Sequence, residues 1–145
     1  MTERSTPLAP IPADITLELH HVGIVVGDID AAVARYTALG FTPAGREVIT
    51  EQGVAVAAFH APPGYVELIS PLDADGAIAR FHAKRGDGMH HAAYRVADLT
   101  AALDRLADAG VRLIDRTPRV GLHGWRVAFI HPEACAGVLT ELVEI

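Results

Sequence analysis

The chain has 145 residues and a formal net charge of −6, with 50% hydrophobic and 21% charged residues. This length and composition are typical of one compact domain and exclude disordered and fibrous proteins. The negative charge disfavours nucleic acid as a partner. A single cysteine, Cys135, rules out an internal disulfide. With no run that resembles a signal peptide or a membrane span, we expect a cytoplasmic protein that does not enter membranes.

Residues 1–16 are rich in Pro, Ser and Thr and predict a flexible leader. The remainder, residues 17–145, contains a repeat displaced by seventy positions: LHHVGIVVGDIDAA at 19–32 returns as MHHAAYRVADLTAA at 89–102. Each copy predicts a strand, an Asp at the helix N-cap, and an amphipathic helix that ends at a glycine. These caps are Asp28 and Asp98, and these glycines are Gly40 and Gly110.

Strand-like segments follow each predicted helix and are separated by turn signals. They are FTPAGREVI (41–49), GVAVAAFH (53–60) and YVELIS (65–70) in the first half, and VRLIDRTP (111–118), WRVAFIH (125–131) and GVLTELVEI (137–145) in the second. We therefore expect an α+β fold in one domain. Two βαβββ modules, at about 17–72 and 88–145 with a linker at 73–87, would form a mixed, cupped sheet.

The doubled histidines at matched positions of the repeat are the first candidate functional residues. Strand alternation predicts that His20 and His90 lie on the apolar face under the helices. It places His21 and His91 on the other face, among small residues and Arg95, as in a ligand cavity. A single histidine on a strand is more often structural, but two at equivalent positions favour a site.

Two carboxylates in apolar strands also need an explanation. Glu67 lies in YVELIS and Glu141 in LTELVE, and burying an unpaired carboxylate costs several kcal/mol. A divalent cation held by His21, Glu67, His91 and Glu141 would neutralise both, and these ligands suit Co²⁺, Mn²⁺, Ni²⁺ or Zn²⁺. The alternative is a metal-free site in which Arg95 or Arg126 pairs with the carboxylates. A further histidine, His123, would line the cavity mouth or lie in an exposed loop.

Five segments resemble the vicinal oxygen chelate superfamily and, within it, the methylmalonyl-CoA epimerase family. They are EQGV (51–54), VELISPL (66–72), GAIARFHAKRGDGMHHAAYRV (76–96), GVRLID (110–115) and GLHGWRVAFIHPEACAGVLTELVE (121–144). The resemblance covers roughly residues 17–145. It places His21, His91 and Glu141 at the family's metal-ligand positions, and Glu67 where family members have Gln or Glu as a further ligand.

The resemblance implies a metal-dependent epimerase that interconverts (R)- and (S)-methylmalonyl-CoA through an enolate. We expect Co²⁺ as the ion, with Mn²⁺, Ni²⁺ or Zn²⁺ as alternatives, an acyl-CoA substrate and a homodimer. Some epimerases carry a Glu, proposed as a base, where this chain has Val56. We therefore expect Glu67 to compensate, so that Glu67 and Glu141 are the catalytic residues. The alternatives are a glyoxalase-like isomerase and a metal-free small-molecule (antibiotic) binding protein of the same superfamily.

Overall fold

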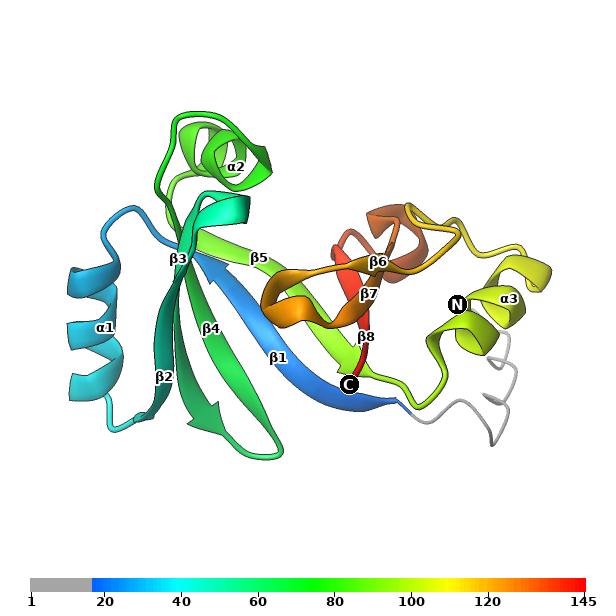
Figure 1. The fold of residues 1–145 in the computed structure, drawn as a ribbon, viewed down its shortest axis with the longest axis horizontal. Helices are drawn as coiled ribbons and strands as arrows, with labels where there is room; N and C mark the ends of the chain where they lie inside the picture. The colour runs from blue at the N-terminus through cyan, green and yellow to red at the C-terminus, as the bar shows by residue number, and fades with distance from the viewer. Residues whose placement is uncertain (1–16) are drawn as a thin grey trace, which may run out of the picture.

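The computed structural model describes residues 17–145, so the predicted leader lies outside the described residues. Both modules have the predicted βαβββ order (Figure 1). The first comprises β1 (Glu18–Val25), α1 (Ile29–Ala38), β2 (Thr42–Ile49), β3 (Val54–Ala61) and β4 (Gly64–Pro71), with the 3-10 turn η1 (Thr50–Gln52). The second comprises β5 (Gly88–Arg95), α3 (Leu99–Asp108), β6 (Arg119–Val120), β7 (Arg126–Ile130) and β8 (Thr140–Glu144), with the 3-10 turns η2 (Leu122–Gly124) and η3 (Pro132–Cys135). Helix α2 (Ala77–Arg85) lies between them.

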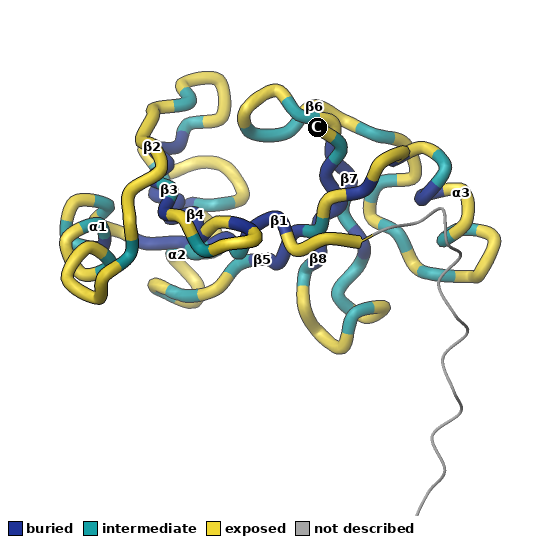
Figure 2. The backbone as a smooth tube through the Cα atoms, turned by 90° about the horizontal axis from the view of Figure 1, so that it is seen from below, coloured by how far each residue is buried: buried dark blue, intermediate teal, exposed yellow. Residues whose placement is uncertain are grey.

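All eight strands form one sheet in the order β2-β3-β4-β1-β5-β8-β7-β6. The two modules meet where β1 pairs antiparallel with β5, and each of these strands pairs in parallel with the last strand of its own module. Counted outward from the centre of the sheet, the strands of both modules therefore follow the same order: first, fourth, third and second. Strands β4, β1, β5 and β8 form the floor of a cup whose walls rise at the two ends of the sheet (Figure 2). The predicted α+β fold with a mixed, cupped sheet is confirmed.

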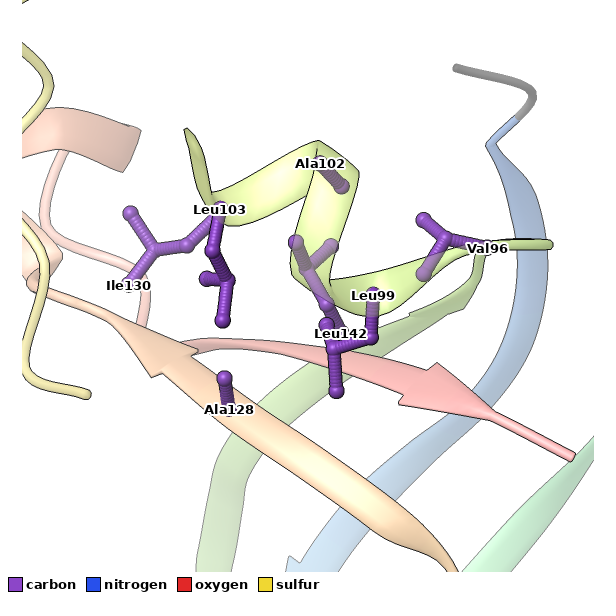
Figure 3. Close-up of a cluster of buried hydrophobic side chains, with 7 residues drawn as sticks. All are labelled: Val96, Leu99, Ala102, Leu103, Ala128, Ile130 and Leu142. Carbon is purple, nitrogen blue, oxygen red and sulfur yellow. The ribbon is translucent and has the colours of Figure 1, made fainter. Parts of the chain in front are cut away.

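The helices cover the outside of the cup and bury the apolar faces of the strands. Beneath α3 lies a core of seven residues, shown in Figure 3: Val96, Leu99, Ala102, Leu103, Ala128, Ile130 and Leu142. The predicted N-caps are confirmed, because the carboxylates of Asp28 and Asp98 accept the backbone N–H of Ala31 and Ala101, each at 3.0 Å. Across residues 17–145 no helix combines the length and apolar character needed to cross a bilayer.

The strand predicted over 111–118 is wrong. In this segment only one isolated bridge forms, between Leu113 and Ile130, and the edge strand β6 begins later, at Arg119. The side chain of Asp115 accepts the backbone N–H of Phe129 at 2.8 Å, and the N–H groups of Ile114 and Asp115 both donate to the Phe129 carbonyl. A carboxylate thus replaces part of the backbone ladder, as short acidic side chains tend to do.

Candidate active site

Strand register on the floor of the cup brings together the four residues predicted as metal ligands. Across the sheet, Glu67 on β4 is level with Gly23 on β1, and Gly23 is level with His91 on β5. Two residues before Gly23 on β1, His21 is level with Ala93 on β5, and Ala93 is level with Glu141 on β8. Laterally paired residues point to the same face, so each row contributes one imidazole and one carboxylate to one surface.

Three of these four side chains form a compact group of buried donor atoms: His21, His91 and Glu141. Their ligand atoms lie within 4.8 Å of one another. His21 Nε2 is 3.0 Å from His91 Nε2 and 3.2 Å from Glu141 Oε1, and His91 Nε2 is 3.7 Å from the same oxygen. Neighbouring ligands on an octahedral ion with bonds of about 2.1 Å lie about 3.0 Å apart. The residues therefore fit a divalent metal ion.

The fourth predicted ligand, Glu67, lies beside this group and also bonds to a histidine of the other module. Its Oε2 is 3.1 Å from His21 Nε2, and its Oε1 accepts a hydrogen bond from His123 Nε2 at 2.9 Å. Burial alone would raise the pKa of this carboxyl. The His123 hydrogen bond and the nearby imidazoles outweigh burial and hold the pKa of Glu67 below its usual value. Glu67 is therefore a carboxylate at neutral pH.

His123 makes contacts in the candidate site that the sequence analysis did not predict. It lines the cavity, one of the two positions expected for it, but it also bridges two acids: its Nδ1 contacts Glu47 on β2 and its Nε2 contacts Glu67 on β4. The hydrogen bond to Glu67 raises the pKa of His123, with Glu47 adding to the shift. Its backbone is left-handed, at φ 65°. Glu47, which was not predicted, had no signal beyond its place in a polar strand.

The prediction that consecutive histidines point to opposite faces is wrong. Leu19 and His21 on β1 pair with two residues of β5 that are consecutive in the chain. His20, which lies between them, is therefore an extra residue in a β-bulge. The same happens on β5, where His90 is the extra residue. His20 Nδ1 lies 2.7 Å from His21 Nδ1, and His90 Nδ1 lies 2.9 Å from His91 Nδ1. The ring of His20 packs edge-on against Trp125 rather than beneath a helix, whereas the ring of His90 packs edge-on against Phe81 of α2.

Burial keeps three of these rings uncharged. It lowers the pKa of His91 to about 3, with further lowering by His21 and His90 and a smaller opposing effect of Glu67. It also lowers the pKa of His20 and of His90, helped by His21 in the first case and by Arg85 in the second. A neutral imidazole has a free lone pair, which is the form that binds metal.

Two cavities open onto the site. The residues that line a cavity of about 730 Å³ include His21, Glu67, His91 and Glu141. Those that line a second cavity, of about 560 Å³, include His20, Glu47, Val56 and Arg95. Glu67, His123 and Trp125 line both. The loop after β6 reaches across the cup toward β2 (Figure 2), which places His123 between the two cavities. Glu67 is thus accessible from two sides.

Gly23 makes room for the His91 ring, and this predicts the effect of a methyl group there. A Cβ on Gly23 would lie 2.2 Å from Cε1 of His91 and 2.7 Å from its Nε2, so the ring would have to move out of the ligand group. We expect Gly23→Ala to lower Co²⁺ affinity at least about tenfold, measured by competition with a chelating dye. The control is Gly45→Ala on β2, where a Cβ meets nothing within 4 Å. Equal Co²⁺ affinity in the two variants would contradict this account.

Comparison with known proteins agrees with this geometry. Residues 20–129 match the Glyoxalase/Bleomycin resistance protein/Dioxygenase superfamily, and the chain belongs to it. Its relatives there include a protein of Cereibacter sphaeroides named ethylmalonyl-CoA/methylmalonyl-CoA epimerase, 38% identical over 130 residues that cover 88% of this chain and 97% of the relative. The predicted superfamily is therefore confirmed.

Solved structures resemble this one closely. The methylmalonyl-CoA epimerase of Mycobacterium tuberculosis has a TM-score of 0.81 and 40% identity, and the match covers 94% of this chain and 92% of that one. A methylmalonyl-CoA epimerase in complex with methylmalonyl-CoA and NH₄⁺ has a TM-score of 0.78 and 39% identity, with coverages of 88% and 94%. Both similarities extend over nearly the whole domain, so they include both halves of the site.

Proposed function

We propose that this protein is a metal-dependent epimerase that interconverts (R)- and (S)-methylmalonyl-CoA. The observation that carries the proposal is the convergence of His21, His91 and Glu141 with Glu67 beside them, each module supplying one imidazole and one carboxylate. The names of the relatives and the bound methylmalonyl-CoA of a similar structure support the same substrate. Glu67 and Glu141 both contact His21, whereas Arg126 bonds to Glu144. These contacts favour a metal site over a metal-free site in which Arg126 neutralises the two carboxylates.

We assign the metal to His21, His91, Glu141 and Glu67, with Co²⁺ as the ion. When bound, a divalent ion supplies Lewis-acid stabilisation of the negative charge that develops on the substrate's carbonyl oxygens. The protein contributes imidazole and carboxylate ligands held in fixed positions by a rigid sheet. It also keeps them away from bulk water, since His21 and His91 are each 5% exposed and Glu67 is 4% exposed.

Inversion at C2 of the substrate requires one base on each face of a planar enolate. We assign these roles to Glu67 and Glu141, which come from equivalent strands of the two modules and flank His21 at 3.1 and 3.2 Å. One carboxylate takes the C2 proton; the C–H electron pair becomes the C=C bond of the enolate, and the carbonyl π pair becomes a lone pair on the thioester oxygen. The other group, which must carry a proton for this direction of the reaction, returns it from the opposite side. Proton exchange with water then resets the pair, and in the reverse reaction the two residues exchange roles.

The position where some epimerases carry a base is occupied here by Val56, which is 1% exposed and lines the smaller cavity. In the strand register Val56 is level with Glu47 on β2. The carboxylate of Glu47, on the strand next to Val56, therefore still borders this cavity, but it contacts His123. This arrangement supports Glu67 as the compensating base. The expected homodimer and cytoplasmic location remain predictions.

The test is solvent isotope exchange at C2 of methylmalonyl-CoA. In D₂O, the Co²⁺-loaded protein should replace the C2 proton by deuterium and invert the centre, and both reactions should stop after chelation and return with added Co²⁺. Proton NMR of the C2 methyl signal measures the exchange, with a protein-free sample as control. A loaded protein that catalyses no exchange contradicts the proposal. Isomerisation of a glutathione hemithioacetal instead would identify a glyoxalase-like enzyme.

A further inference from the structure

The two histidine doublets share a feature that the assigned ligands do not explain. In each doublet the second histidine faces the site, and the first is an extra residue of a β-bulge whose ring meets it at Nδ1. A regular strand would send the two rings to opposite faces. The bulge brings them within hydrogen-bond distance, and it does so at equivalent places in both modules.

The positions of protons follow from these contacts. The four rings form a chain: His20 Nδ1 to His21 Nδ1 at 2.7 Å, His21 Nε2 to His91 Nε2 at 3.0 Å, and His91 Nδ1 to His90 Nδ1 at 2.9 Å. Each neutral imidazole has one N–H. If Nε2 of His21 and of His91 both offer lone pairs to one ion, then each must carry its proton on Nδ1. That proton can be donated to Nδ1 of the preceding histidine.

We propose that His20 and His90 are positioning residues that accept these Nδ1 protons and thereby fix the metal-binding tautomers of His21 and His91. The inference rests on the proposed function only in requiring a metal site. Metal-bound histidines generally donate their second ring nitrogen to a fixed acceptor, and loss of that acceptor costs about 10–100-fold in metal affinity. Here the acceptor is the neighbouring residue in the chain, which the bulge places at Nδ1.

Matched variants separate hydrogen bonding from packing. Asn places an oxygen, and Leu a methyl group, at the atom where His has Nδ1. We expect His20→Leu and His90→Leu to weaken Co²⁺ binding about 10–100-fold, and His20→Asn and His90→Asn to stay within about threefold of wild type. Affinity is measured by competition with a chelating dye. Equal losses in the Leu and Asn variants, or no loss in either, would overturn the inference.

A second measurement uses Zn²⁺, which is diamagnetic, in place of Co²⁺. Proton NMR spectra of the Zn²⁺-loaded protein should show the Nδ1–H protons of His21 and His91 far downfield and slow to exchange with water, because each is held in a hydrogen bond. In the Leu variants the affected proton should move upfield and exchange faster. Fast-exchanging Nδ1–H protons in the wild type, or unchanged signals in the Leu variants, would contradict the inference. A wild type without Co²⁺ affinity would overturn both this inference and the proposed function. A wild type that binds Co²⁺ but catalyses no C2 exchange would overturn the proposed function alone.

Discussion

Glu67→Gln should strongly slow inversion while leaving one of the two epimers able to exchange its C2 proton. Gln matches Glu in size and keeps an oxygen that can face His21, 3.1 Å away in the wild type, but an amide is not a base. The epimer whose proton faces residue 67 should become inert. The other should exchange through Glu141 and return to the same configuration. A positioned base contributes about 10²–10⁴-fold to rate, so inversion should fall by this factor.

The measurement follows each epimer separately in D₂O by NMR, with Co²⁺ at saturation. Glu141→Gln is the matched variant, and it should spare exchange of the opposite epimer. Glu141 also belongs to the group of metal donors, so this variant should in addition need more Co²⁺ for saturation. Glu67→Gln protein that inverts at the wild-type rate would contradict the assignment of Glu67 as a base.

The repeat explains why so much of the site could be predicted. An offset of seventy residues relates His21 to His91, and matched apolar strands contain Glu67 and Glu141. Strand periodicity, helix caps and the cost of burying carboxylates are local properties that each segment carries by itself. They were sufficient for the two modules and for the floor of the cup, where the register then brings these residues level.

The features that sequence reasoning missed depend on the partner strand or the other module. A β-bulge is decided by how two strands pair, so the rotation of His20 and His90 toward their neighbours has no signal in either strand alone. Glu47 and His123 come from different modules and meet only because the sheet curves into a cup. The strand predicted over 111–118 does not form, and there the side chain of Asp115 bonds to the β7 backbone in place of part of the ladder.

Acidification should destabilise the metal-free protein strongly, beginning below about pH 6.5. Burial lowers the pKa of His91 from 6.5 to about 3, so between these values the unfolded state binds a proton that the folded state does not. Stability therefore falls as pH falls through this window. At about 1.36 kcal/mol per pH unit, His91 alone should cost about 2 kcal/mol of unfolding free energy between pH 6.5 and pH 5. The lowered pKa values of His20 and His90 act in the same direction.

The other two shifted groups of the site change their contributions to stability mainly outside the range from pH 6.5 to pH 5. Glu67 has a lowered pKa, so its contribution to stability is present above about 4.5 and is lost at lower pH. His123 has a raised pKa, so its contribution is complete below about 6.5 and is lost as pH rises. The net fall between pH 6.5 and pH 5 thus reflects three imidazoles that resist protonation, because the contributions of Glu67 and His123 change mainly below and above this range.

Urea unfolding of chelator-treated protein from pH 7.5 to pH 5 measures this loss. His91→Leu should flatten the dependence, because the ring that resists protonation is gone, whereas His60→Leu, at an exposed histidine at the end of β3, should preserve it. Bound Co²⁺ should make the fall steeper, since protons then also compete with the ion for the lone pairs of His21 and His91. A metal-free wild type with constant stability across this range would mean that His91 is protonated as easily in the fold as in the unfolded chain. Its ring would then lie in water rather than on the buried floor of the cup.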